Sequence, residues 1–143
     1  MKNWIKTGSV LMTVAIFLIA CTKEETPLKA DESFTVTESD SLIYEAKFMS
    51  SGKSTSGTVE VYENDGEHTL AFSDFKTGNG PDIRVYLSVD QKDDEFINLG
   101  DLRAVEGSFT YEIPADVDLE KYDHVLIWCD DFSLLFGYAD IVQ

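Results

Sequence analysis

Hydrophobic and polar residues alternate in short runs along most of the chain from Leu42 onward. Residues 57–63 alternate one by one, and an Asn-Asp-Gly turn at 64–66 separates them from a second run at 68–72, which is typical of a hairpin. Segment 125–129 is apolar at every position, which indicates a strand buried on both faces. Further strand-like runs lie at 83–88, 96–102, 108–113 and 134–141. Seven to nine short strands at ~10-residue spacing predict an all-β fold, an antiparallel β-sandwich or a barrel-like domain.

Residues 1–20 are predicted to be a lipoprotein signal peptide. Lys2 and Lys6 provide a positive start, and an uncharged, largely apolar run follows at 8–20. This run is shorter than the ~20 apolar residues that span a bilayer. It ends in Leu-Ile-Ala before Cys21, which resembles a lipobox with the Cys21 thiol as the nucleophile that receives the lipid. We predict that Cys21 is lipidated; the alternative is an uncleaved anchor that leaves the domain on the same side of the membrane.

The segment after the lipobox bears on location. Two acyl chains with a third on the amine would give stable membrane attachment. Thr22 follows the cysteine in place of the Asp that often retains lipoproteins at the inner membrane, and 23–25 (Lys-Glu-Glu) resembles the export signal of some surface lipoproteins. We predict a lipid-anchored protein of the cell envelope, on the extracytoplasmic side at the outer membrane or cell surface. Residues 21–41 are predicted to be a flexible acidic tether and 42–143 the β domain.

Charge limits the partners. Removal of residues 1–20 takes Lys2 and Lys6 from the 11 basic residues and none of the 27 acidic ones, which leaves a formal charge of −18. Such a field repels nucleic acid and anionic lipid, so nucleic-acid binding is excluded as the main activity. It favours cationic partners, which are metal ions or a basic protein face. A basic or redox protein is the partner that we expect.

Motifs for substrate turnover are missing from the sequence. There is no Gly-x-Ser-x-Gly elbow, metalloprotease helix or phosphate loop, so we do not expect an enzyme with its own substrate. The acidic stretches at 90–95 and 116–118 lack the spacing of an EF-hand. Solvated loops are the first interpretation of both, and a loose calcium site is the alternative.

Cys129 is the residue on which the functional question depends. The chain has two cysteines, and lipidation would consume Cys21, so Cys129 has no partner within the chain. It could be a small buried hydrophobe, or a thiol that meets solvent at the end of a strand and works in redox chemistry. The following Asp130 and Asp131 disfavour a thiolate unless a cation such as Arg84 or Arg103 lies against it.

A haem or another prosthetic group near Cys129 is a further possibility, although the sequence has few other residues that could ligate it. His124 is expected on the opposite face of the strand, ~17 Å away. His68 is expected at the surface, and Met49 is an outside candidate for a haem ligand. No Cys-x-x-Cys-His motif exists, which excludes covalent c-type haem. The aromatic side chains expected in the core are Phe72, Phe75, Tyr86, Trp128, Phe132, Phe136 and Tyr138.

Several of these segments, taken in order, resemble a known family. They are 56–59, 70–75, 79–82 leading to 85–87, 99–102, 111–114, 125–129 and 132–139. Together they are similar to the electron-transfer DM-thirteen domain over about 46–141. The resemblance implies an all-β fold and a cysteine that works in redox chemistry, as a bare thiol or by holding a prosthetic group. In this sequence that cysteine is Cys129.

Two functions are therefore expected. The first is a membrane-tethered electron-transfer or redox accessory domain that uses Cys129. The second is a non-enzymatic binding or adhesion module in which Cys129 is a packing residue.

Overall fold

The computed structural model describes residues 26–32 and 34–142, so the predicted signal peptide and Cys21 lie outside the described residues. The described chain forms two five-stranded sheets, sheet A with the order β1-β8-β5-β4-β2 and sheet B with the order β3-β10-β9-β6-β7. Neighbouring strands are antiparallel except β1 and β8, which are parallel. The strands are β1 (Ala30–Asp31), β2 (Ser41–Lys47), β3 (Met49–Ser50), β4 (Ser56–Asn64), β5 (Glu67–Lys76), β6 (Ile83–Ser88), β7 (Phe96–Asp101), β8 (Glu106–Ile113), β9 (His124–Cys129) and β10 (Leu134–Asp140).

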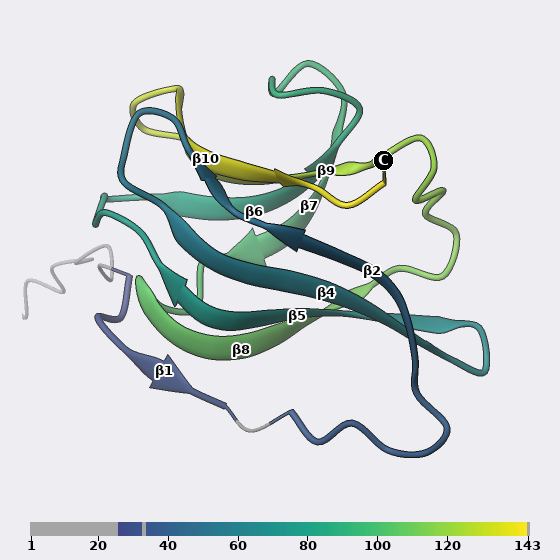
Figure 1. The fold of residues 1–143 in the computed structure, drawn as a ribbon. Helices are drawn as coiled ribbons and strands as arrows, with labels where there is room; N and C mark the ends of the chain where they lie inside the picture. The colour runs from purple at the N-terminus through teal and green to yellow at the C-terminus, as the bar shows by residue number, and fades with distance from the viewer. Residues whose placement is uncertain (1–25, 33, 143) are drawn as a thin grey trace, which may run out of the picture.

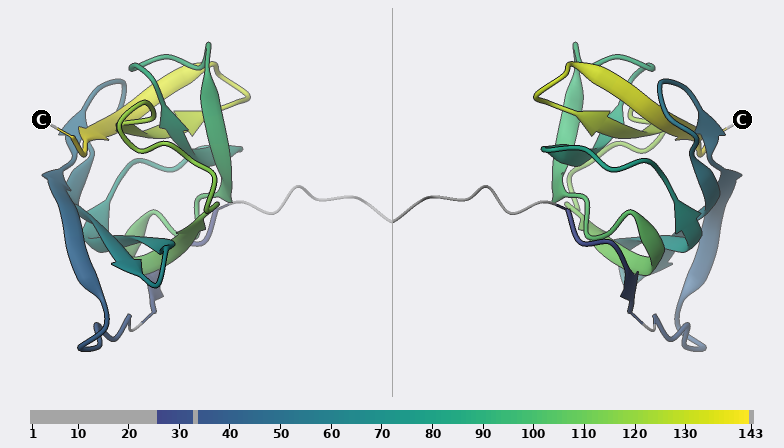
Figure 2. Two further views of the ribbon diagram at one scale, coloured as in Figure 1. Left: turned by 90° about the vertical axis from the view of Figure 1, so that its right-hand side faces the viewer. Right: turned by 90° about the vertical axis from the view of Figure 1, so that its left-hand side faces the viewer.

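The two sheets stack as layers, which confirms the predicted all-β sandwich (Figures 1 and 2). The described strands number ten rather than seven to nine. Two of them, β1 and β3, have only two residues each and are too short to show an alternating pattern. Within the described ranges no helix is long and apolar enough to cross a membrane.

The β4–β5 hairpin follows the predicted turn. Asn64 and Glu67 are paired, and Asp65 and Gly66 between them have φ values of 51° and 85°. Positive φ at both central positions matches the twist of the flanking strands, and glycine adopts it without steric cost. The Gly66 amide also donates a hydrogen bond of 2.7 Å to the Glu63 carboxylate.

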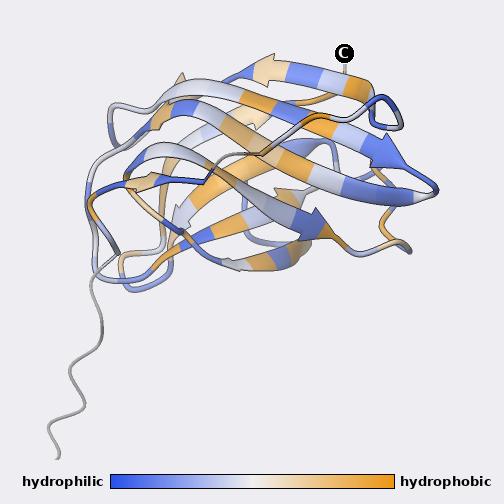
Figure 3. Ribbon diagram, turned by 90° about the horizontal axis from the view of Figure 1, so that it is seen from below, coloured by the Kyte–Doolittle hydropathy of each residue, from blue (hydrophilic) through white to orange (hydrophobic). Residues whose placement is uncertain are grey.

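The core lies between the sheets, where alternating residues of both layers meet. Hydrophobic and hydrophilic positions alternate along the strands in Figure 3. On the sheet A side, Phe48, Phe72, Phe75 and Phe109 form a ring cluster with centroids 5.1–5.7 Å apart. Phe48 joins β2 to β3, so the chain passes from sheet A to sheet B at a buried aromatic side chain.

Sheet B also buries residues on its outer face. Tyr86, Leu126 and Trp128 form a second cluster there, with Leu135 and Tyr138 packed against them; we call these five residues the outer cluster. Val125, Ile127 and Cys129 of β9 face the core, and Leu126 and Trp128 belong to the outer cluster. Segment 125–129 is therefore buried on both faces, as its apolar run predicts.

Part of the segment expected to be a tether lies against sheet A. Ala30–Asp31 pairs with β8, and the Pro27 carbonyl accepts a hydrogen bond of 3.0 Å from the Val105 amide. Strand addition at a sheet edge uses backbone groups, so it needs no hydrophobic pattern in the sequence. Gly107 makes the approach possible, because a Cβ at this position would lie 1.6 Å from the Ala30 carbonyl oxygen.

Candidate functional site

Cys129 is the last residue of β9, and its side chain lies on the inner face of sheet B. It is a free thiol, is 0 % exposed, and belongs to the core cluster with Ile83 and Ile127. Its Cα partners are Ile83 on β6 and Leu134 on β10. Of the two positions considered for this thiol, the structure has the enclosed one.

A short turn at 130–133 connects Cys129, the last residue of β9, to the first residue of β10. The Asp130 amide donates a hydrogen bond of 2.9 Å to the Asp82 carbonyl, and the Ser133 amide donates one of 3.2 Å to the Asp130 carbonyl. Cys129 and Leu134 are consequently the last pair of the β9–β10 ladder. The thiol is buried although it stands at a strand end, because its side chain belongs to the core between the sheets.

The two arginines considered as partners of the thiol bind carboxylates elsewhere. The Nε atom of Arg84 lies 2.9 Å from Asp82, and its Nη1 atom lies 3.0 Å from Asp101. Arg103 pairs with Glu32 at 3.0 Å, with its guanidinium 5.3 Å from the centre of the Tyr111 ring. Cys129 therefore has an apolar core environment rather than the cationic one that favours a reactive thiolate.

Asp130 lies on the other side of the sheet from the thiol and binds Tyr86. The Tyr86 hydroxyl donates a hydrogen bond of 2.5 Å to Oδ1 of Asp130, and Oδ2 of Asp130 is 3.8 Å from Nε of Arg84. Burial raises the pKa of Tyr86, and the hydrogen bond to Asp130 raises it further. The hydrogen bond to Asp82 raises the pKa of Arg84 against the effect of burial. Sequence reasoning used Asp130 only as a neighbour of Cys129 and did not identify this pair.

The ring of Tyr86 is enclosed by the other residues of the outer cluster and by Phe96 of β7. The two rings are stacked, with centroids 4.1 Å apart and planes 20° apart. Tyr86 and Trp128 are buried as expected, but on the outer face rather than between the sheets. Phe132 was expected in the core and is 63 % exposed, because the turn at 130–133 carries it away from the sheet. Phe72, Phe75 and Phe136 are buried in the main core, and Tyr138 is partly buried in the outer cluster.

The candidate haem ligands do not gather around Cys129. His124 lies at the opposite end of β9 on the other face, with Nδ1 2.5 Å from Asp123 and Nε2 3.3 Å from Asp140. Met49 is in register with Tyr138, at the edge of sheet B. His68, expected at the surface, is partly buried in β5, where it pairs with Ile113. A haem or other group ligated by Cys129 does not fit this arrangement, because the thiol is enclosed by apolar side chains and faces none of these ligands.

The acidic loops bind their own backbone and a lysine. Asp90 accepts a hydrogen bond of 2.9 Å from the Lys92 amide, and Asp118 accepts one of 3.0 Å from the Glu120 amide. Glu95 forms an ion pair with Lys121. In the described part of the chain, no group of three or more His, Cys, Asp or Glu side chains is placed to hold a metal ion.

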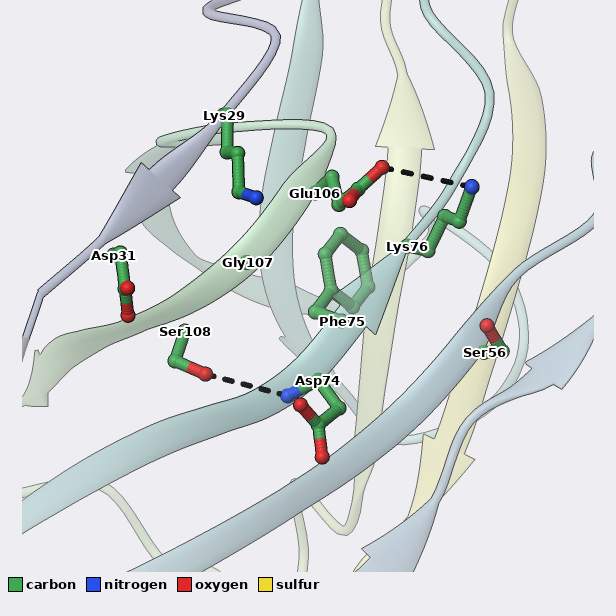
Figure 4. Close-up of a pocket in the computed structure, with 9 residues that line it drawn as sticks. All are labelled: Lys29, Asp31, Ser56, Asp74, Phe75, Lys76, Glu106, Gly107 and Ser108. Carbon is green, nitrogen blue, oxygen red and sulfur yellow. Dashed lines mark hydrogen bonds and ion pairs between the residues drawn. The ribbon is translucent and has the colours of Figure 1, made fainter.

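A solvent-open hollow of about 310 Å³ lies at the edge of sheet A, between β1, β5 and β8 (Figure 4). Lys76 pairs with Glu106 at 3.5 Å on one side, and the Asp74 amide donates a hydrogen bond of 3.3 Å to Ser108 on the other. Both positively and negatively charged residues line the hollow, such as Lys29 and Asp31. The hollow has no single-sign field to select a ligand.

Comparison with known proteins adds one finding. A family model described as electron transfer DM13 matches residues 47–141, from the last residue of β2 to the residue after β10. No curated protein and no solved structure matches this chain. The match confirms the resemblance drawn from the sequence and contains the sheet B strands that bury Cys129 and Tyr86. The chain belongs to the electron transfer DM13 family.

Proposed function

We propose that this protein is an electron-transfer accessory domain that lipidated Cys21 holds on the extracytoplasmic side of a membrane. Membership of the electron transfer DM13 family supports the electron-transfer role. The apolar run and lipobox before Cys21 support the anchor. The domain serves a redox partner and has no substrate of its own.

Cys129 is the proposed redox group, and the observation that carries this is its place at a strand end, next to an exposed turn. The pair Cys129–Leu134 ends the ladder, and residues 130–133 beyond it are exposed. The ends of an element open at lower free energy than the whole fold. Loss of this pair and of the hydrogen bond from Asp130 to Asp82 exposes the thiol while the rest of the sandwich stays folded.

The exposed thiol reacts with a disulfide of the partner. Cys129 loses its proton to solvent, and its thiolate attacks one partner sulfur. A sulfur–sulfur bond forms between Cys129 and that atom, while the partner's own sulfur–sulfur bond breaks and its second sulfur leaves as a thiolate. Cys129 is thereby oxidised and the departing sulfur reduced.

The partner is expected to present a basic surface. The mature chain has a formal charge of −18 once Lys2 and Lys6 are removed with residues 1–20. Asp82, Asp101 and Asp130 gather around one arginine at the end of sheet B where Cys129 lies. A cationic face would be steered to this end, with an association rate that falls as salt rises.

Thiol labelling of the folded full chain tests the redox group. We expect the labelling rate of Cys129 to be independent of low denaturant concentrations, because the opening exposes little surface. A matched Cys129→Ala/Ser54→Cys chain, labelled at an exposed position, gives the intrinsic rate. A labelling rate that follows global unfolding at every denaturant concentration would contradict the proposal that local opening of the turn at 130–133 exposes Cys129.

The lipid anchor has its own test. Cys21→Ala is expected to move the protein from the membrane to the soluble fraction.

The second candidate is a non-enzymatic binding or adhesion module with a structural Cys129. The observation that favours it is the 0 % exposure of Cys129 among apolar side chains. It predicts that Cys129→Ala keeps partner binding and every cellular phenotype. An oxidative phenotype of that variant would favour the electron-transfer role.

A further inference from the structure

We propose that Tyr86 is a second redox group, which gives up one electron while its phenolic proton passes to Asp130. The inference rests on the electron-transfer function proposed above but not on Cys129. Tyr86 lies on the outer face of sheet B, and the thiol lies on the inner face. Three features of the structure support it: a proton acceptor bonded to the Tyr86 hydroxyl, the burial of the Tyr86 ring, and an aromatic contact from that ring to the surface.

The proton acceptor is already hydrogen-bonded. The Tyr86 hydroxyl is 2.5 Å from Oδ1 of Asp130, so the proton moves along an existing bond. Nε of Arg84 lies 3.8 Å from Oδ2 of Asp130, on the carboxylate oxygen that does not bind Tyr86. The Asp130 side chain is 40 % exposed, so a proton received from Tyr86 has a path to water.

The ring of Tyr86 is shielded, yet one side chain away from solvent. Tyr86 is 2 % exposed, whereas the Phe96 ring stacked on it is 37 % exposed. Trp128 on the neighbouring strand and Tyr138 are the other aromatic side chains of the outer cluster. Shielding protects a phenoxyl radical from small molecules, while the stacked aromatic contact brings the surface within range of electron transfer.

Tyr111 provides the contrast. It is also buried, but its hydroxyl donates to the Asp101 carbonyl at 3.0 Å and accepts from the Arg103 amide at 2.9 Å. A backbone carbonyl does not take up a proton at neutral pH, so Tyr111 has no base to assist its oxidation. The arrangement at Tyr86 therefore exceeds what the satisfaction of a buried hydroxyl requires.

The O–H bond of Tyr86 breaks, an O–H bond forms on Asp130, and one electron leaves the ring, which yields a neutral phenoxyl radical and a protonated carboxyl group. The electron reduces a high-potential one-electron oxidant of the partner, of the ferryl-haem class. The proton acceptor acts in the same way as a general base in catalysis.

Flash photolysis of the full chain tests the proposal, with photogenerated tris-bipyridine ruthenium(III) as the oxidant. We expect a fast, pH-independent phase of tyrosyl-radical formation. Tyr86→Phe removes this phase, and Asp130→Asn, which keeps a hydrogen-bond acceptor but no base, slows it by about a hundredfold. Tyr138→Phe, in the same outer cluster, leaves the phase intact and is the matched control.

A fast phase that survives Tyr86→Phe, or one that Asp130→Asn leaves unchanged, overturns the proposal. Both variants retain the ring stack on Phe96, and thermal unfolding shows whether they fold. The labelling rate of Cys129 in the wild-type chain tests separately whether local opening exposes this thiol. Failure of the Tyr86 proposal is therefore distinguishable from failure of the Cys129 proposal.

Discussion

The hydroxyl of Tyr86 lies 2.5 Å from Oδ1 of Asp130, and Asp130 begins the turn that follows Cys129. This hydrogen bond joins the outer face of sheet B to the turn that follows the buried thiol. With the hydrogen bond from the Asp130 amide to the Asp82 carbonyl, it holds the turn by both its side chain and its backbone. We therefore expect opening of this turn to require the loss of both hydrogen bonds.

Tyr86→Phe is expected to increase the labelling rate of Cys129 in the folded chain by roughly ten- to a hundredfold. A hydrogen bond to a charged group contributes about 1.5–3 kcal/mol, and its loss makes opening of the turn that much easier. Thiol-reagent kinetics without denaturant measure the change. Tyr111→Phe, which loses hydrogen bonds to Asp101 and Arg103 instead, serves as the control. Equal rates in wild type and Tyr86→Phe would show that Asp130 does not hold the turn.

Replacement of Cys129 tests how apolar its site is. Cys129→Ala is expected to lower the free energy of unfolding by about 1 kcal/mol through lost packing. Cys129→Ser is expected to cost about 1–3 kcal/mol more, because a hydroxyl enclosed by the core finds no partner. Urea unfolding of both variants measures the difference. A serine variant as stable as the alanine variant would mean that the site offers a polar partner.

Gly107→Ala is expected to detach β1 from sheet A. Gly107 has a φ of 129°, and an added Cβ would lie 1.6 Å from the Ala30 carbonyl oxygen. Gly66→Ala is the matched control, because its φ is 85° but the space around it is open. We expect Gly66→Ala to cost about 1–2 kcal/mol of stability from backbone strain alone. Only Gly107→Ala should expose the Glu32 amide, which bonds to Ser108 at 2.8 Å, to rapid hydrogen exchange. Continued protection of that amide would contradict the prediction.

Stability is expected to fall at alkaline pH because of two tyrosines. Burial raises the pKa of both Tyr86 and Tyr111 above the ordinary value of 10.0. Below that pH both states keep the protons, so these groups have no effect; above it the unfolded chain loses protons that the folded chain retains, which favours unfolding. Urea unfolding across an alkaline pH series measures the decline, and Tyr86→Phe should make it shallower. An identical pH dependence in that variant would argue against the contribution of Tyr86.

Much of the strand arrangement could be predicted from local patterns. The alternation at 57–63 and the Asn-Asp-Gly turn at 64–66 led to the observed hairpin, since both signals act between neighbouring residues. No strand was predicted at β1, β2 or β3, and all three pair at sheet edges, where backbone groups make the contact. Phe132 was misplaced for a related reason: hydrophobicity predicts burial only when the backbone directs the side chain inward.

The sequence by itself determined the all-β class, the hairpin, the family and Cys129 as the unpaired cysteine, because these depend on residue type and on spacing along the chain. Only the tertiary structure decided that Cys129 is enclosed and that Tyr86 bonds to Asp130. Both follow from the order of strands in sheet B, which places β9 between β6 and β10. That order arises from contacts between segments far apart in the sequence, and no local pattern encodes them.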